Sequence, residues 1–216
     1  MARTHRISSE RPASARGGAR PFRVRVLGCK VNQCEADEIR GALNARGLKE
    51  AGRGESAAVA VLHSCAVTAE AVRKTRQALR RLAKAEPDVL LLSGCAAGEE
   101  LTGGLKPEPV RVPAGPRWRE RLESALDGAG LGRASGGPRR ASDPRQTRAF
   151  LKIQDGCDLG CAYCIVPSLR GTPRDRPPGD VLEEARELAQ RGHREIVVTG
   201  ISVGLYGRNG GYDLRE

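Results

Sequence analysis

The stretch Val89-Leu90-Leu91-Leu92-Ser93-Gly94-Cys95 decides the fold of the first part of this 216-residue chain. Its four consecutive apolar residues, 89–92, are typical of a strand that is buried on both faces, as in a parallel sheet. A cysteine follows this strand closely. Apolar strands and amphipathic helices alternate on both sides of the stretch, so the sequence predicts an α/β protein.

The predicted elements alternate along residues 22–126. Each predicted helix carries apolar residues on one face, and two of them end at Gly47 and before Pro87, residues that stop helices. Strands are predicted at 22–27, 57–62, 89–92 and 110–112, and helices at 35–46, 69–85 and 118–126. This order implies a parallel sheet with right-handed crossovers, of the Rossmann or flavodoxin-like kind.

Cysteines follow the first three predicted strands, at Cys29, Cys65 and Cys95. Parallel strands end at one edge of their sheet, and open α/β folds bind ligands at that edge. Glycine precedes Cys29 and Cys95 and lets a bulky group approach the backbone. Three thiolates at one edge predict an iron–sulfur cluster with one iron free of protein ligands. The alternative is three unrelated buried thiols, the role expected for Cys34.

A second cysteine set follows a predicted strand at 149–153. Cys157, Cys161 and Cys164 form a C-x3-C-x2-C run. Three thiolates leave one iron of a cubane cluster open, and an open coordination position can hold a substrate. A zinc knuckle or chance clustering is the alternative. A four-ligand zinc site is disfavoured because no further Cys or His lies near the run in the sequence.

These patterns divide the chain into four parts. Residues 1–20 are predicted to be a disordered basic tail, 21–127 the α/β domain, and 128–148 a linker rich in Gly, Pro, Ser and Arg. Residues 149–216 begin a second domain, with a predicted helix at 179–191, a strand at 195–199 and no clear element afterwards. Two strands and one helix are too few for a separate α/β domain, so this second unit is expected to be truncated.

Composition restricts the cellular compartment and the partners. Seven cysteines, an odd number, and an Arg-rich start without an apolar segment favour cytosolic, metal-binding thiols over a secreted disulfide framework. No apolar stretch reaches the roughly 18 residues of a membrane helix. Of the net charge of +11, +6 lies in residues 1–25 and +4 in residues 131–148. Such segments can bind RNA phosphates, or they can simply be Arg-rich linkers. Charge alone does not decide between these two interpretations.

Both cysteine sets, in this order, resemble the methylthiotransferase family of radical S-adenosylmethionine (SAM) enzymes over residues 22–210. Gly28-Cys29-Lys30-Val31-Asn32-Gln33 is similar to the opening motif of the branch that acts on tRNA threonylcarbamoyladenosine. Further matching segments are Cys65-Ala66-Val67-Thr68, Lys74-Thr75-Arg76-Gln77, Ser93-Gly94-Cys95-Ala96, Cys164-Ile165-Val166-Pro167, Arg170-Gly171 and Glu195-Ile196-Val197-Val198-Thr199-Gly200. Cys34 and His63-Ser64 depart from the family pattern, and His63 is expected to be a packing or hydrogen-bonding residue.

The resemblance implies a fold and a set of cofactors. The fold is a parallel-sheet methylthiotransferase domain followed by the first β/α units of a radical SAM partial TIM barrel. The cofactors are SAM and two 4Fe–4S clusters, one on Cys29, Cys65 and Cys95, and one on Cys157, Cys161 and Cys164.

The resemblance also implies contacts with SAM. Tyr163 is expected beside the adenine of SAM and Thr199-Gly200 near its methionine end. Core packing and a plain strand end are the respective alternatives. Arg170 is expected to bind a SAM carboxylate or an RNA phosphate. A solvated basic loop is an equal alternative for the neighbouring Arg174 and Arg176.

For the complete enzyme, the resemblance implies replacement of a C–H bond on a tRNA adenosine next to the anticodon by a methylthio group. Acids and bases of ordinary pKa cannot activate such a bond, so a radical derived from SAM is needed. The implied partners are tRNA and an electron donor such as flavodoxin or ferredoxin, in the cytoplasm and without a membrane. The sulfur donor is not identified by the sequence.

Two groups of alternatives stay open. Within the family, the substrate can be an isopentenyladenosine tRNA or a ribosomal protein. Outside it, the chain can be a non-catalytic metal-cluster module that binds RNA. The family continues through further β/α units and a small RNA-binding barrel, so residues 1–216 alone are expected to be catalytically deficient.

Overall fold

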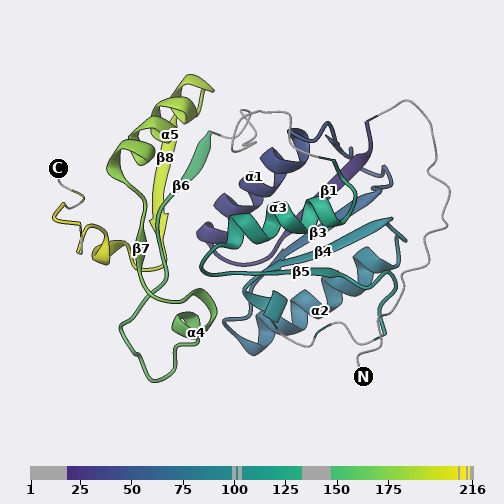
Figure 1. Ribbon diagram of the computed structural model, residues 1–216, viewed down its shortest axis with the longest axis horizontal. Coiled ribbons are helices and arrows are strands. Elements are labelled where there is room, and N and C mark those ends of the chain that lie inside the picture. The colour runs from purple at the N-terminus through teal and green to yellow at the C-terminus, as the bar shows by residue number, and fades with distance from the viewer. Residues whose placement is uncertain are drawn as a thin grey trace, which may run out of the picture.

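The computed structural model describes residues 19–98, 101, 104–132, 147–208, 210–212 and 214. Its elements form two units, one around a five-stranded sheet and one around a three-stranded sheet (Figure 1). Nearly all of the predicted tail (1–20) and most of the predicted linker (128–148) lie outside the described residues. The domain boundaries at 127 and 148 therefore stay a prediction. Within the described residues, no helix has the length and apolar character needed to cross a membrane.

The first sheet is entirely parallel, and the predicted α/β fold is confirmed. Its strands follow the order β2-β1-β3-β4-β5, and every neighbouring pair runs in the same direction. The strands are β1 (Pro21–Val26), β2 (Lys49–Glu50), β3 (Val59–Ser64), β4 (Val89–Gly94) and β5 (Val110–Pro113). β2 was not predicted because its two exposed charged residues give no apolar signal.

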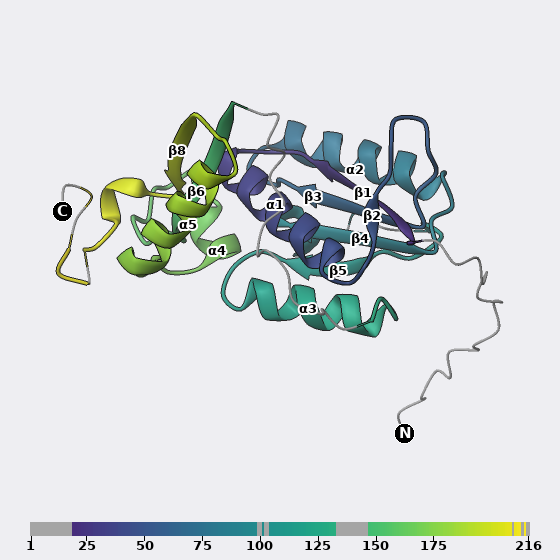
Figure 2. The same cartoon turned by 90° about the horizontal axis from the view of Figure 1, so that it is seen from above.

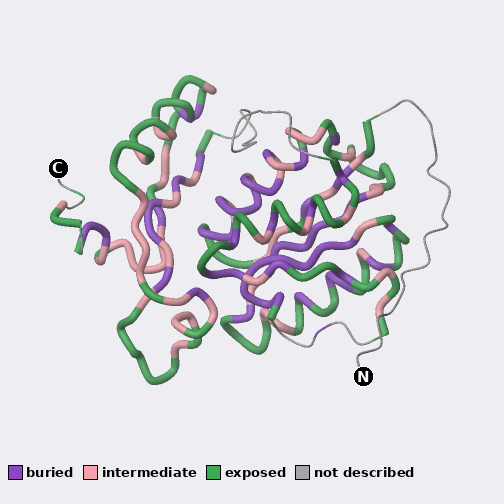
Figure 3. Tube along the Cα trace, in the orientation of Figure 1, coloured by how far each residue is buried: buried purple, intermediate pink, exposed green. Residues whose placement is uncertain are grey.

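Helices cover both faces of this sheet (Figure 2). α1 (Lys30–Asn44) and α3 (Trp118–Gly128) pack on one face, and α2 (Ala69–Ala83) packs on the other. The α2 face buries Ala60, Leu62, Leu90 and Leu92 of the sheet against Ala78, Leu79 and Ala83. β3 and most of β4 are therefore buried, as their continuous apolar runs require (Figure 3).

α1 begins five residues before the predicted start at residue 35. Cys29 is its N-terminal flanking residue, with an extended backbone. The prediction missed the first turns because buried polar residues, Asn32 and Glu35, interrupt the apolar pattern there. This correction matters for the site, since it joins the first cysteine directly to the helix.

The second unit is a three-stranded sheet in the order β7-β6-β8. β8 runs parallel to β6, and β7 runs antiparallel to it. The elements are β6 (Arg148–Asp155), α4 (Val166–Arg170), β7 (Arg174–Asp175), α5 (Pro178–Gln190), β8 (Glu195–Gly200) and the 3-10 helix η2 (Val203–Leu205). α4, β7 and η2 are too short to produce a periodic signal, and the expectation of no element after residue 200 is wrong for η2.

Candidate functional site

The first cysteine set lies at the carboxyl edge of the five-stranded sheet. Cys29 follows β1, Cys65 follows β3, and Cys95 follows β4, where it opens the 3-10 helix η1 (Cys95–Gly98). The three strands are adjacent and parallel, with Val26 opposite His63 and Ser64 opposite Gly94. The three cysteines therefore share one edge of the sheet.

The strand ends that carry these cysteines are tied together by Asn32. Its amide nitrogen donates hydrogen bonds to the carbonyl oxygens of Leu27 (3.0 Å) and Ser64 (2.9 Å). Its Oδ1 accepts a hydrogen bond from the thiol of Cys29, at 3.5 Å. The ends of β1 and β3 are thus fixed to the first turn of α1.

The environments of these thiols differ. Cys29 is exposed, Cys65 is half-buried and Cys95 is buried. Burial raises the pKa of the Cys95 thiol, and the neighbouring Arg170 guanidinium opposes that rise. Cys34 is fully buried within α1.

The second cysteine set lies in the loop that follows β6. Cys161 is exposed, and Cys157 and Cys164 are half-buried. The amide of Cys157 donates to the carbonyl of Gly171, and the amide of Cys164 donates to that of Cys161, each at 3.0 Å. The loop is thus held by backbone bonds while its thiols stay accessible.

The chemistry of both sets fits an iron–sulfur cluster. All six cysteines are free thiols, and thiolate sulfur is the usual protein ligand of such clusters. Within the described residues, no three Cys, His, Asp or Glu side chains come together as a metal site would. Ligation of a cluster by each set therefore stays a proposal.

The other predicted SAM contacts lie around the same loop. Tyr163 is 93% exposed, which rules out core packing. Thr199 and Gly200 end β8, and Gly200 pairs with Gln154 of β6. The Gln154 side chain donates to the carbonyl of Gly156 (2.8 Å) and accepts from the amide of Ser202 (2.8 Å). The end of β8 is thereby tied to the start of the cysteine loop.

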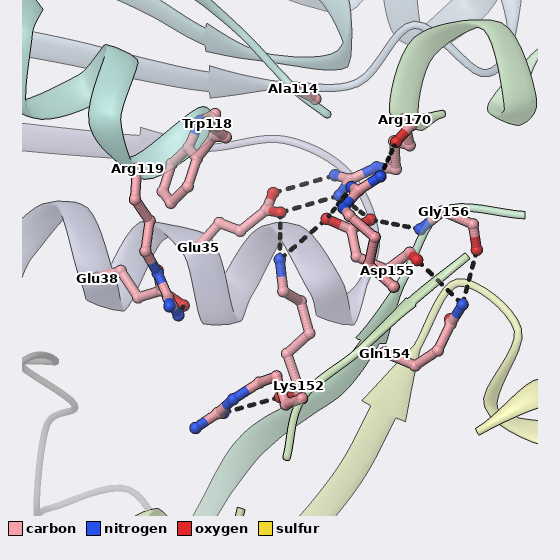
Figure 4. Close-up of polar contacts among 12 residues, drawn as sticks. Glu35, Glu38, Ala114, Trp118, Arg119, Lys152, Gln154, Asp155, Gly156 and Arg170 are labelled. Atoms are coloured by element: carbon pink, nitrogen blue, oxygen red, sulfur yellow. Dashed lines mark hydrogen bonds and ion pairs between the residues drawn. The ribbon is translucent and has the colours of Figure 1, made fainter. Parts of the chain in front are cut away.

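Arg170 lies at the junction between the two units (Figure 4). Its guanidinium forms a bidentate pair with Glu35 of α1, with Nη1–Oε1 at 2.9 Å and Nη2–Oε2 at 3.0 Å. It also donates to Asp155 (3.0 Å) and to Asn32 (3.2 Å). The side chain is 1% exposed. In this structure the guanidinium of Arg170 binds the carboxylates of Glu35 and Asp155. Its contact with a SAM carboxylate therefore stays a prediction for the SAM-bound protein.

Lys152 and His63 complete the buried network. Lys152 Nζ lies 2.7 Å from Glu35 Oε1 and 3.2 Å from Asp155 Oδ2. His63 Nε2 lies 2.9 Å from Glu35 Oε2, in keeping with the hydrogen-bonding role expected for this histidine. The two carboxylates thus face Lys152, Arg170 and a third, partly exposed cation, Arg174, whose Nη2 lies 3.5 Å from Asp155 Oδ2.

The protonation state of Glu35 follows from these partners. Burial alone would raise its pKa. The charges of Lys152 and Arg170, together with hydrogen bonds from His63 and Arg170, lower the pKa by more than burial raises it. The pKa of Glu35 is therefore held well below its ordinary value, and the carboxylate is ionised at neutral pH.

Apolar and backbone contacts hold α4 against the first unit. Leu169 packs on a small cluster formed by Ala66, Cys95, Ala96, Leu101 and Ala114. A β-carbon at Gly115 would lie 3.1 Å from the carbonyl oxygen of Leu169, so these two segments of the backbone approach each other closely. The helix that follows Cys164 therefore packs directly against Cys95 of the other cysteine set.

Comparison with known proteins finds a matching family model for each of the two units. Residues 21–111 match Uncharacterized protein family UPF0004, and residues 151–215 match the Radical SAM superfamily. A tRNA-2-methylthio-N(6)-dimethylallyladenosine synthase from Novosphingobium aromaticivorans is 33% identical over 215 residues, covering 93% of this chain and 48% of the relative. The chain belongs to the radical SAM methylthiotransferase family.

Relatives with a second substrate in their names are equally similar. Threonylcarbamoyladenosine tRNA methylthiotransferases from Bacillus subtilis and Chlamydia pneumoniae are each 33% identical, over 198 and 191 residues. They are covered to 44% each, with 85% and 86% of this chain aligned. The chain spans about half the length of the curated relatives it matches. Membership of the radical SAM superfamily implies SAM and a 4Fe–4S cluster.

The junction between the two units was not predicted from the sequence, although one signal was present. Val31, Glu35, Ile39 and Leu43 are spaced by four residues and lie on one buried helix face. A carboxylate within an apolar helical stripe predicts a buried ion pair. The identity of its partners could not be read from that stripe.

Gly156 offers a test of how the chain shapes its second cysteine loop. Gly156→Ala should destabilise the loop by more than the ~1–2 kcal/mol that a left-handed backbone costs, because the new β-carbon would clash with the carbonyl oxygen of Thr172. Gly160→Ala is the matched control, since it has a similar positive φ but nothing within 4 Å. The readouts are the free energy of unfolding and the alkylation rate of Cys157. Equal effects of the two variants would contradict the steric argument.

Proposed function

We propose that this chain supplies the cluster-binding residues of a tRNA methylthiotransferase that acts on N6-threonylcarbamoyladenosine next to the anticodon. The observation that carries the proposal is the packing of α4. This helix begins two residues after Cys164, and its Leu169 packs on the cluster that contains Cys95. The short helix α4 thus connects the two cysteine sets. This arrangement suits a reaction in which both sets act at the same substrate atom.

Each cysteine set has a role in this proposal. Cys157, Cys161 and Cys164 would hold the cluster that binds SAM, and Cys29, Cys65 and Cys95 would hold a second cluster that carries the sulfur. When bound, the first cluster supplies the electron that converts SAM into a hydrogen-abstracting radical. Gly156 lets the loop approach Thr172, and Gln154 hydrogen-bonds both to that loop and to Ser202, just after the end of β8. Thr199 and Gly200 then line the side of the loop where SAM is proposed to bind.

The choice of nucleoside rests on the motif Gly28–Gln33, which resembles the threonylcarbamoyladenosine branch. The second candidate substrate is dimethylallyladenosine tRNA, because a relative with that name aligns with 93% of this chain. The identities do not separate the two, since relatives of both names reach 33%. We further propose a flavodoxin or ferredoxin as the electron donor and the cytoplasm as the compartment.

Nucleoside analysis of tRNA decides between these substrates. The gene that encodes this chain, in its native length, is expressed in a host that lacks both tRNA methylthiotransferases. We expect 2-methylthio-threonylcarbamoyladenosine to appear and 2-methylthio-dimethylallyladenosine to stay absent, as measured by mass spectrometry of digested tRNA. The reverse result would transfer the assignment to the second candidate. Neither product, from protein that contains iron, would contradict the proposed function.

A further inference from the structure

The outer face of α2 concentrates positive charge. Residues 73–84 contain six cations and no acidic residue. All six are exposed, while Thr75, Ala78, Leu79 and Ala83 are buried on the inner side. The cations are Arg73, Lys74, Arg76, Arg80, Arg81 and Lys84. The first unit thus carries a strongly basic surface, although most of the net charge of the chain lies in other segments.

This basic surface is poorly neutralised by the protein itself. Glu70 pairs with Arg73 (2.7 Å) and Lys74 (3.5 Å) at the start of the helix. The other four cations form no ion pair with a carboxylate among the residues that the structure describes. Arg80 lies four residues from both Arg76 and Lys84, and like charges at this spacing destabilise a helix by about 0.2–0.5 kcal/mol per pair. Such a surface lowers helix stability, and a polyanionic partner would reverse that effect.

The side chains also form a hollow. Arg73, Arg76, Gln77, Arg80, Arg81 and Lys84 line an open depression of about 460 Å³. Residues 73–84 extend over ~17 Å at 1.5 Å per helical residue. α2 starts four residues after Cys65, at the edge of the sheet that bears the first cysteine set. The basic surface therefore begins near that edge and extends away from it along the outside of the first unit.

We infer that the outer face of α2 binds the phosphate backbone of the RNA substrate and thereby orients it toward the cysteine edge. This inference rests on the proposed function only for the identity of the RNA. Guanidinium groups, which make up four of the six cations, bind phosphate oxygens through paired hydrogen bonds. The face presents no large exposed apolar side chain, whereas protein interfaces have an apolar core. These features favour a nucleic acid over an acidic protein. Contacts to phosphates position RNA without reading its sequence.

The test compares two variants of the 216-residue chain that each lose four positive charges. One is Arg76→Gln/Arg80→Gln/Arg81→Gln/Lys84→Gln. The control is Lys49→Gln/Arg53→Gln/Lys106→Gln/Arg194→Gln, at exposed positions scattered outside α2, one in β2 and three in connecting segments. Binding to an unmodified tRNA transcript is measured by fluorescence anisotropy over a roughly sixfold range of salt, from about 50 to 300 mM.

We expect the α2 variant to bind at least tenfold more weakly at about 0.1 M salt, with the slope of log K against log salt reduced by roughly 2–3. The control should keep most of the slope. Glutamine is a good helix former, so the melting temperature of the α2 variant should not fall. Equal losses in both variants would overturn the inference. The inference would also be overturned if the α2 variant kept its tRNA binding but was no longer reduced by an acidic flavodoxin. That result would assign the face to the electron donor. Because binding is measured without turnover, failure of tRNA methylthiolation would leave this result intact.

Discussion

Replacing Glu35 with glutamine should lower the free energy of unfolding by about 3–5 kcal/mol, the usual cost of breaking a buried ion pair by removing one partner. Glu35 is the shared acceptor of Arg170, Lys152 and His63. Its neutral amide would leave two buried cations with Asp155 as the remaining carboxylate. The change keeps the size of the side chain, so the loss reports charge rather than a cavity. Denaturant unfolding, followed separately in the two units by hydrogen exchange, measures the effect.

Two controls make this prediction specific. Glu120→Gln removes a carboxylate from an exposed pair with Arg117, and it should cost less than ~1 kcal/mol. Glu35→Gln combined with Arg170→Met should be less destabilised than the sum of the single changes, because the unpaired guanidinium is then removed as well. Additive costs would show that Glu35 and Arg170 do not stabilise each other.

Acidification should reproduce part of the same loss. The pKa of Glu35 is lowered in the folded chain, so its stabilising contribution is complete above its pKa in the unfolded chain and is lost as the pH falls below that value. The difference in unfolding free energy between the native chain and Glu35→Gln should therefore shrink below about pH 4.5, the ordinary value. A difference that stays constant down to pH 3 would show that the carboxylate is not the charged partner.

The triple change Cys157→Ala/Cys161→Ala/Cys164→Ala should halve the iron bound after anaerobic reconstitution and abolish reductive cleavage of SAM. The reason is that three thiolates hold each proposed four-iron cluster, and SAM is proposed to bind the cluster in the loop after β6. Iron counting and detection of 5′-deoxyadenosine measure the two effects. The expected iron content of the native chain is about eight per molecule.

The matched variant carries alanine at Cys29, Cys65 and Cys95. It should also lose half of the iron but keep SAM cleavage, since the second set is left intact. Cys34→Ser should retain the full iron content because Cys34 is buried inside α1. SAM cleavage that survives loss of Cys157, Cys161 and Cys164 would place SAM at another site.

The sequence predicted the parts of the fold that depend on local periodicity. The apolar runs of β3 and β4 and the amphipathic pattern of α2 gave the strands and helices within about two residues, and the parallel order placed three cysteines at one edge. Two-residue strands such as β2 and β7 have no period to detect. α4 was missed for the same reason, because five residues give little more than one helical turn.

The junction could not be predicted from the sequence, because its specificity is tertiary. Arg170 was expected to bind a SAM carboxylate or an RNA phosphate, and in the structure it pairs instead with Glu35, 135 residues away. Glu35 itself lies on α1, a helix whose start was predicted too late in the chain. Local patterns can indicate that a charged residue is buried, but the packing of two units determines which charge it meets.

The buried position of Glu35 also has a consequence for the order of folding during synthesis. Glu35 leaves the ribosome 135 residues before Arg170, which is roughly 7–27 s at 5–20 residues per second. His63 follows Glu35 after only 28 residues, within the first unit. The nascent first sheet can therefore form around a Glu35–His63 pair, with the face that will receive α4 still open to water. Arg170 and Lys152 then arrive at a carboxylate already held in place, so the first unit acts as the template on which the radical SAM unit docks.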